Sequence, residues 1–143
     1  MIEFKDVCFK YKDIDVLKNV TVNIGEGESV ALIGANGSGK STFLKLLNGI
    51  VFSQKGKYYF EKTEICEKRM NDSKYSKLFH KKIGFIFQNS DAQLFCPTVY
   101  EEIAFGPRQM GMDEKSVKSR VEDCLDLLGI SNLKHRQPYN LSG

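Results

Sequence analysis

The chain has 143 residues and a net charge of +3, with 41% hydrophobic and 27% charged residues. These values are typical of one compact globular domain, and the charge is too small to indicate a nucleic-acid partner. No apolar run approaches the ~18 residues of a membrane span, and residues 1–5 lack the pattern of a signal peptide, so we expect a cytoplasmic protein.

The first half of the chain reads as strands interrupted by turns. Residues 2–9 and 16–24 predict two strands, the second with apolar residues at period two, and residues 25–28 predict a turn. Residues 29–33 form a short apolar run, which is typical of a strand buried on both faces of a parallel sheet. Residues 40–47 carry Leu44 and Leu47 at helical spacing and predict a helix.

The middle of the chain predicts three further elements. Residues 57–61 read as a strand and residues 72–79 as a short polar helix. Residues 83–87 are the second strongly apolar candidate strand.

After Pro97 the pattern becomes helical. Asp113 is a plausible N-cap, and Gly129 closes the helix that follows. The apolar stripe of this helix consists of Val117, Val121, Leu125 and Leu128. The sequence therefore predicts an α/β core followed by a helical piece.

Cysteine and histidine give little sign of a metal or redox site. The four cysteines form no C-x-x-C pair and the two histidines are isolated, so we expect reduced thiols. These residues are Cys8, Cys66, Cys96, Cys124, His80 and His135.

A glycine-rich loop joins the apolar run at 29–33 to the helix at 40–47. It matches the pattern G-x-x-x-x-G-K-[ST] without a mismatch, between a predicted strand and a predicted helix, which is the context that supports a phosphate-binding loop. The predicted phosphate-binding residues are Gly34, Ala35, Asn36, Gly37, Ser38, Gly39, Lys40, Ser41 and Thr42.

Each part of this loop has a chemical role. The glycines allow backbone N–H groups to point inward around phosphate oxygens, and the helix adds its positive N-terminal end. Lys40 supplies a positive charge to the β- and γ-phosphates, and the Ser41 hydroxyl is a ligand for Mg²⁺. Thr42 offers its hydroxyl or N–H group to the α-phosphate. The sequence therefore predicts ATP and Mg²⁺ as ligands.

Four landmarks appear in the order found in ABC ATPases, which the chain resembles along its whole length. Tyr11 lies where that family carries an aromatic residue that stacks on adenine, and the phosphate loop follows. Gln88 lies where the family places a glutamine that helps to hold Mg²⁺ and the attacking water and couples to a membrane partner. Leu141, Ser142 and Gly143 look like the opening of the LSGGQ signature, which acts on the nucleotide of a second subunit.

The resemblance implies a fold and a division of the chain. The fold is an α/β P-loop NTPase of the ABC type, with an antiparallel β subdomain, part of the helical subdomain, and the C-terminal part of the sheet missing. Residues 1–143 form a partial ATP-binding domain. Residues 1 to about 95 hold the nucleotide-binding core and the glutamine loop, and about 96–143 begin the helical subdomain.

The segment after Gln88 narrows the resemblance to the energy-coupling-factor group, which includes cobalt and nickel importers. The similar stretches are residues 88–95, 97–99 and 102–107. The resemblance implies a peripheral subunit on the cytoplasmic face of the cell membrane that energises import of a metal ion or vitamin. Its partners would be a second ATPase subunit, a transmembrane coupling protein and a substrate-capture membrane subunit.

Three alternatives stay open at this point. The segment after Gln88 is also compatible with a generic ABC helical subdomain. A soluble ABC ATPase acting on ribosomes or DNA is a further possibility, although no tandem cassette or coiled-coil insertion is visible. An unrelated P-loop GTPase is disfavoured because no N-K-x-D motif is present.

The family's remaining catalytic groups would lie beyond Gly143. They are the Walker B Asp, the catalytic Glu and the switch His, so we expect an ATP hydrolase by family and negligible turnover by residues 1–143 alone, although Lys40 and Gln88 are present. The strands at 29–33 and 83–87 would also lack their parallel neighbours. We therefore expect an insoluble or molten chain when it is expressed alone, explained by an incomplete sequence or a disrupted gene.

Overall fold

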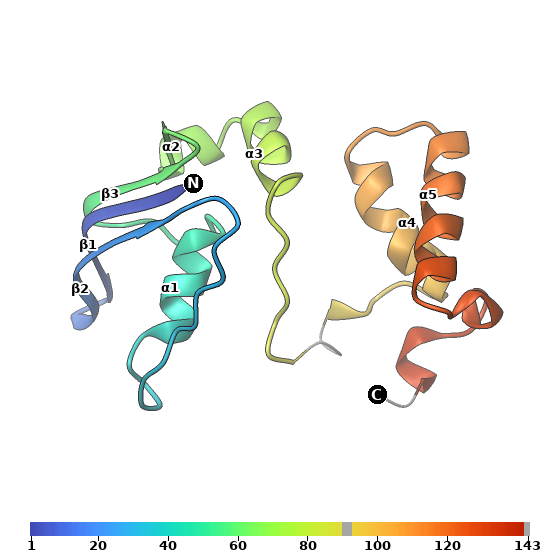
Figure 1. Cartoon of the computed structure of the whole chain (residues 1–143), viewed down its shortest axis with the longest axis horizontal. Helices are drawn as coiled ribbons and strands as arrows, with labels where there is room; N and C mark the ends of the chain where they lie inside the picture. Colours follow the sequence, from blue (N-terminus) through green and yellow to red (C-terminus); the bar gives the residue numbers. More distant parts are fainter. Residues whose placement is uncertain (90–92, 142–143) are drawn as a thin grey trace. The chain divides into compact units, whose positions relative to one another are not determined.

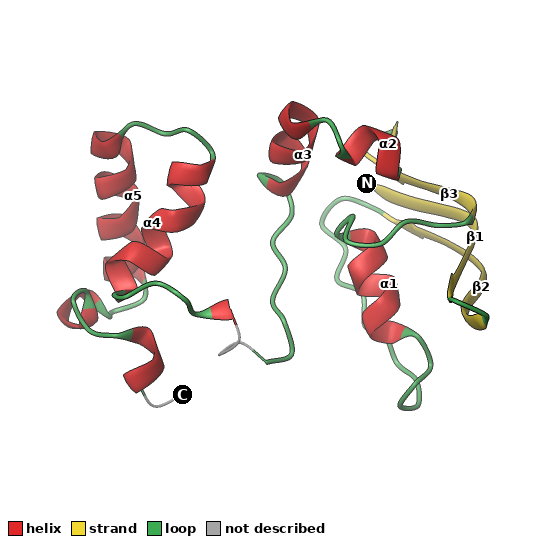
Figure 2. Ribbon diagram, turned by 180° about the vertical axis from the view of Figure 1, so that it is seen from behind, coloured by secondary structure: helices red, strands yellow, loops and turns green. Residues whose placement is uncertain are grey.

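The computed structural model of the 143-residue chain describes residues 1–89 and 93–141, and these separate into two compact units. The first unit spans residues 1–84 and holds the strands together with helices α1, α2 and α3 (Figures 1 and 2). The second unit spans residues 85–143 and holds helices α4 and α5. The first unit carries the phosphate loop.

The first unit is built on an antiparallel sheet with the strand order β2-β1-β3-β4. Its strands are β1 (Ile2–Tyr11), β2 (Ile14–Ile24), β3 (Lys55–Phe60) and β4 (Thr63–Glu64). The strands predicted at 2–9, 16–24 and 57–61 are confirmed, each with somewhat different ends. The turn between β3 and β4 places two consecutive residues at positive φ, which suits the right-handed twist of a tight hairpin.

Three helices accompany the sheet. Helix α1 spans Lys40–Leu47, as predicted, and α2 is a single turn at Glu67–Met70. Helix α3 spans Ser73–His80, and the Asp72 carboxylate caps it by accepting a hydrogen bond from the Lys74 amide at 2.9 Å. The short helix predicted at 72–79 is therefore confirmed, with Asp72 as its cap.

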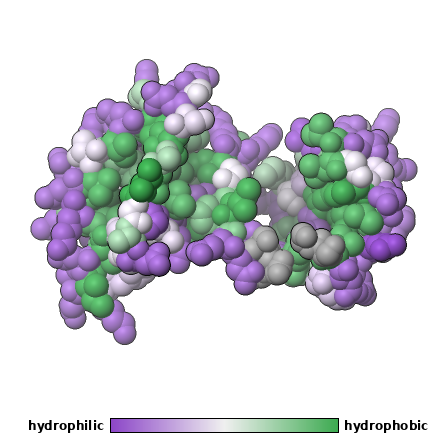
Figure 3. All heavy atoms as spheres, turned by 60° about the horizontal axis from the view of Figure 1, so that its bottom comes forward, coloured by the Kyte–Doolittle hydropathy of each residue, from purple (hydrophilic) through white to green (hydrophobic). Residues whose placement is uncertain are grey.

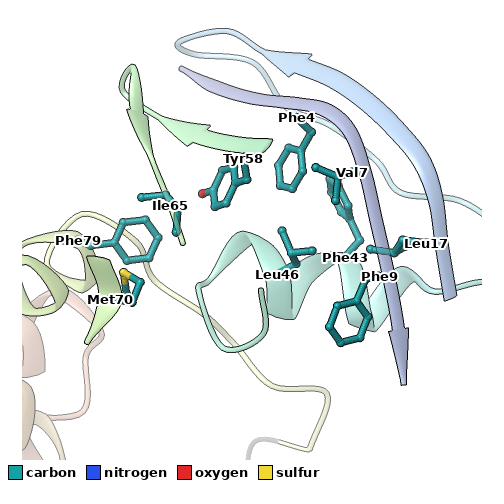
Figure 4. Packing of buried hydrophobic residues seen from close by; sticks show 10 residues of the cluster. All are labelled: Phe4, Val7, Phe9, Leu17, Phe43, Leu46, Tyr58, Ile65, Met70 and Phe79. Carbon is teal, nitrogen blue, oxygen red and sulfur yellow. The ribbon is translucent and has the colours of Figure 1, made fainter. Parts of the chain in front are cut away.

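The core of the first unit forms where the sheet curves over α1 (Figure 4). The ring of Phe4 on β1 stacks on Tyr58 of β3 at 4.4 Å between centroids and contacts Phe43 of α1 at 4.8 Å. Leu46 of α1 is 1% exposed in the same cluster. The Tyr58 hydroxyl donates a hydrogen bond to the Leu47 carbonyl at 2.9 Å, and burial raises the pKa of this hydroxyl, so it remains a donor.

The buried face of α1 carries Phe43 and Leu46. Leu44 is 43% exposed, whereas Phe43 and Leu46 enter the core and Leu47 packs at its edge. Leu44 and Leu47 have helical spacing, but Phe43 and Leu46 have the same spacing one position earlier. The aromatic ring of Phe43 fits against Phe4, and this contact decides which face turns inward.

The second unit is a helical hairpin. Helix α4 spans Val99–Gln109 and α5 spans Glu114–Leu127, with Asp113 accepting the Ser116 amide at 3.0 Å as the predicted N-cap. The buried side chains of this unit are Val99, Ala104, Val117, Val121 and Leu125. Leu128, which the sequence placed on the apolar stripe, is the C-cap of α5 and is 61% exposed.

An ion-pair network joins the start of α5 to the end of α4. The Arg108 guanidinium donates to both carboxylate oxygens of Glu114, at 2.8 and 3.0 Å, and also pairs with Glu101. Hydrogen bonding from Arg108 lowers the pKa of Glu114, so this carboxylate stays ionised to lower pH than an ordinary one. The loop between the two helices is thus fixed at both ends.

The predicted strands at 29–33 and 83–87 are wrong for the described residues. Both segments are without regular structure, because residues 1–89 and 93–141 offer neither of them a hydrogen-bonding partner strand. Their side chains remain in contact with solvent: Val30 is 58% exposed, Ile33 91% and Ile86 86%. Apolar side chains gather at the surface in the space-filling view (Figure 3). Across the described parts of the chain, no helix is both long and apolar enough to cross a bilayer.

We predict that Tyr58→Phe destabilises the first unit by about 1 kcal/mol, since it removes the hydroxyl that bonds Leu47 but keeps the stacked ring. Urea unfolding followed by circular dichroism measures this. Tyr139→Phe, at a residue that is 63% exposed, is the control and should leave the midpoint unchanged. Equal midpoints for wild type and Tyr58→Phe would show that the bond to Leu47 contributes nothing.

Candidate nucleotide-binding site

The glycine-rich loop enters α1 directly and is held against β2. The helix begins at Lys40, and its first backbone bond runs from the Phe43 amide to the Gly39 carbonyl at 2.8 Å. The loop contains a turn that is closed by a hydrogen bond from the Ser38 amide to the Ala35 carbonyl at 3.2 Å. The loop is therefore a turn and a helix start in immediate succession.

Two glycines adopt backbone conformations that other residues resist. Gly37 has φ +80° and Gly39 has φ +93°, both in the left-handed region. A Cβ atom on Gly39 would lie 3.0 Å from the Val16 carbonyl oxygen and from the Leu17 side chain, whereas one on Gly37 would meet nothing within 4 Å. Gly39 is thus required both by its conformation and by the close approach of β2.

Lys40 reaches back over its own loop. Its ammonium donates to the Gly34 carbonyl at 2.7 Å and to the Ala35 carbonyl at 2.8 Å. The positive charge is therefore held across the loop. A phosphate that enters the loop meets this charge together with the amides.

The start of α1 is free to bind an anion. Gly39 has no side chain to cap the helix, and among the described residues no other side chain caps it. The first turn also contains no acidic residue, so the amides of Lys40, Ser41 and Thr42 and the helix dipole remain available. Ser41 is exposed, which fits a hydroxyl ligand for Mg²⁺, whereas the Thr42 side chain is buried and leaves its amide as the group that faces a ligand.

Tyr11 lies at the end of β1 in the same unit as the loop. It is 43% exposed, contacts Phe9 edge-to-face at 4.8 Å, and pairs with Ile14 across the hairpin. Ile14 precedes Val16, the residue of β2 that approaches Gly39. The hairpin therefore presents an accessible aromatic ring on the strand next to the one that supports the loop.

Gln88 and Leu141 belong to the second unit. Gln88 is exposed, and the amide of the preceding Phe87 donates to the side-chain oxygen of Gln93 at 3.4 Å. Leu141 packs against the α4–α5 core. Ser142 and Gly143 lie outside the described residues. The predicted site residues are thus divided between the two units.

Glu102 is a structural residue that the sequence reading did not single out. Its carboxylate accepts hydrogen bonds from the amides of Phe95 and Cys96, at 3.1 and 2.8 Å, and so ties the segment before α4 to that helix. Burial and the nearby Glu102 charge raise the pKa of the Cys96 thiol, which therefore stays protonated. In the sequence, Glu102 lies five residues after Pro97, within the stretch 102–107 that carries the resemblance to the energy-coupling-factor group.

The described part of the chain contains no cluster of three or more His, Cys, Asp or Glu side chains that could hold a metal ion. A Mg²⁺ ion at this site would therefore depend on a hydroxyl such as that of Ser41 and on the oxygens of the nucleotide itself.

A glycine-rich loop, an uncapped helix start and a lysine across the loop define the class of P-loop nucleotide-binding proteins. The profile of the family described as ABC transporter matches residues 17–143, and the chain belongs to that family.

Individual relatives agree with this assignment. A Clostridium acetobutylicum protein named, provisionally, as an ABC transporter ATP-binding protein is 57% identical over 143 residues, covering 100% of this chain and 59% of that protein. The nickel import ATP-binding protein LarO of Lactiplantibacillus plantarum is 43% identical, with coverage of 100% and 59%. The solved structure of cbiO1 from Clostridium perfringens, part of the ABC transporter complex cbiONQ, matches with a TM-score of 0.81 at 32% identity and covers 99% of this chain and 55% of that one.

The α/β fold of the ABC ATPase cassette is thereby confirmed, with its antiparallel sheet. The chain spans 55% of the length of cbiO1 and 59% of the length of each of the two relatives named above.

We predict that Gly39→Ala is more harmful than Gly37→Ala. Both changes force a side chain into the left-handed region, but only Gly39→Ala adds contacts at 3.0 Å with β2, so it should destabilise the protein by about 1–3 kcal/mol more. Urea unfolding of the two variants measures the difference. Equal destabilisation would mean that β2 moves away without penalty and does not hold the loop.

Proposed function

We propose that residues 34–42 bind the phosphates of ATP, and that the chain belongs to the ATPase subunit of an energy-coupling-factor-like importer. The observation that carries this proposal is the Lys40 ammonium held across the loop at 2.7 and 2.8 Å from two carbonyls, beside an uncapped helix start. Each of these features of the loop serves phosphate binding.

The roles of the individual residues follow from their placement. Lys40 neutralises the β- and γ-phosphates, Ser41 contributes one oxygen to Mg²⁺, and the Thr42 amide faces the α-phosphate. Tyr11 stacks on the adenine ring, since its exposed ring lies on the strand beside the one that supports the loop. Gln88 helps to hold Mg²⁺ and the attacking water.

The complete protein hydrolyses ATP as a dimer in this proposal. The signature beginning at Leu141, Ser142 and Gly143 completes the γ-phosphate site of a second ATPase subunit. The added length of the relatives is the natural source of the remaining catalytic groups and of partner strands for residues 29–33 and 83–87. We propose that residues 1 to about 95 hold the nucleotide-binding core and the glutamine loop, and that about 96–143 begin the helical subdomain.

The proposed membrane partner and membrane location rest on the segment after Gln88. LarO is a nickel import ATP-binding protein, and cbiO1 is part of the ABC transporter complex cbiONQ. We propose by analogy that a transmembrane coupling protein docks beside Gln93 and Phe95, that a separate membrane subunit selects a metal ion or vitamin, and that the ATPase lies at the cytoplasmic face of the membrane. The exposed Phe95 ring, 66% accessible and edge-to-face with Phe105 at 4.8 Å, suits such a contact.

We predict that Lys40→Ala abolishes detectable ATP binding, because the loop loses its only full positive charge and about 1.5–3 kcal/mol for each charge-assisted bond to phosphate. Isothermal titration calorimetry measures the affinity, and circular dichroism verifies that the variant is folded. Lys45→Ala, on the same helix, is the matched control and should bind as the wild type does. Unchanged affinity in a folded Lys40→Ala protein would refute the phosphate site.

We further predict that a photo-crosslinker placed at Phe95 in the cell attaches to an integral membrane protein. The same group at Tyr139, which is 63% exposed, is a control for non-specific labelling. Mass spectrometry identifies the partner. Adducts with ribosomal or DNA-bound proteins alone would favour the soluble ABC ATPase over the importer.

A further inference from the structure

Positive charge is concentrated in the segment that contains α2 and α3. Residues 67–82 hold six of the 21 basic residues and two of the 18 acidic ones, so this segment alone has a net charge of +4 while the whole chain has +3. The basic side chains, all exposed, are Lys68, Arg69, Lys74, Lys77, Lys81 and Lys82. The remainder of the chain is therefore close to neutral.

Three of these lysines lie on one face of α3. Lys74, Lys77 and Lys81 follow one another at intervals of three and four residues, which places them on the same side of the helix. The opposite side packs inward, where Phe79 is 3% exposed and Tyr75 contacts the core of the unit. The lysine face is therefore held outward by the burial of the other face.

This lysine face has charges that the rest of the first unit does not neutralise. Within residues 1–89 and 93–141, neither Lys74, Lys77 nor Lys81 approaches a carboxylate within 4.0 Å. Neighbouring cations behave differently, because Lys82 pairs with Glu61 and Arg69 lies 5.4 Å from the Tyr75 ring centroid. The three lysines thus keep their full charge for a partner.

An apolar side chain sits beside these charges. Leu78 is 61% exposed on α3, next to Lys77 and one turn from Lys74 and Lys81. Its side chain borders a shallow hollow of about 300 Å³ formed with Phe60 and Phe79. An exposed leucine among lysines is unfavourable in water and is typical of a surface that meets both phosphate groups and hydrocarbon.

We propose that the lysine face of α3 binds anionic lipid headgroups and that Leu78 enters the acyl boundary of the bilayer. The proposal rests on the peripheral membrane location proposed above and adds a direct lipid contact to it. Lysine suits this role because its flexible stem and compact charge follow mobile phosphates without requiring a fixed geometry. A nucleic acid is a poorer partner, since the net charge of the chain is only +3, and Leu78 gives a phosphodiester backbone nothing to contact.

The test uses the protein produced from its complete reading frame and flotation with vesicles. Vesicles of phosphatidylcholine mixed with phosphatidylglycerol are compared with vesicles of phosphatidylcholine alone. We expect the protein to float only with the anionic vesicles and to be released by salt. Replacement of Lys74, Lys77 and Lys81 by glutamine should weaken this binding on the order of 100-fold, about fivefold for each charge removed.

A matched variant controls for net charge. Lys115, Lys118 and Arg120 lie on α5 and are exposed, and their replacement by glutamine removes the same number of charges. Because glutamine has a helix propensity close to that of lysine and arginine, both triple variants should keep their helices. The α5 variant should bind anionic vesicles as the wild type does, and Leu78→Ser should weaken binding even at low salt.

Two further results separate this proposal from the nucleotide site. Lys40→Ala should lose ATP binding and still float with anionic vesicles, whereas the α3 triple variant should bind ATP normally. Equal flotation of the α3 and α5 triple variants would overturn the lipid contact. The lipid contact would also be overturned if the α3 variant alone lost binding to RNA or to an acidic protein while its binding to vesicles stayed unchanged.

Discussion

The packing of α1 against the curved sheet is the constraint on which the phosphate loop depends. Phe43 and Leu46 anchor the helix under β1 and β3, and Gly39 fixes the distance between its first turn and β2. These contacts set the direction in which the helix N-terminus points. A loop whose ends are held in this way presents its amides in one arrangement before any ligand arrives, so little ordering remains to oppose binding. The chemistry of the site is therefore a consequence of apolar burial a few residues away.

Lysine ammonium groups have two different arrangements in the first unit. At the loop, a single ammonium is tied to two carbonyls, and its position is defined to within hydrogen-bond distance. On α3, three ammonium groups project without partners among the described residues and gain their effect from number and proximity. The first arrangement suits one small anion that must be held in a fixed place. The second suits a broad anionic surface whose groups move.

The sequence was sufficient to predict those features of the structure that depend only on residues close together in the chain. The bounds of α1 and the cap at Asp113 follow from glycine, aspartate and helical spacing, and both are present. The strands predicted at 29–33 and 83–87 are absent from the described residues, because a strand exists only with a partner, and apolar composition says nothing about whether a partner is at hand. The inward face of α1 depended in the same manner on Phe4, which lies far away in the sequence.

Some residues of the candidate site could likewise be recognised from the sequence, and others could not. The loop could be recognised from its own residues, since its function depends on backbone geometry that glycine alone permits. Glu102 could not, because its role lies in two backbone amides that only the folded segment brings to it. Tyr11 was singled out by its place in a family pattern, and its role stays a prediction; the structure gives it an exposed ring at the end of β1.

Amide hydrogen exchange with and without Mg²⁺-ATP tests the phosphate site most directly, because it observes the backbone groups that are meant to bind. The account predicts slower exchange on ATP addition for the amides of residues 34–42, with inorganic sulfate or AMP giving much weaker protection. Amides of the β3–β4 hairpin should exchange at the same rate in both states. Unchanged exchange in the loop at saturating ATP, or protection confined to other segments, would contradict the central claim.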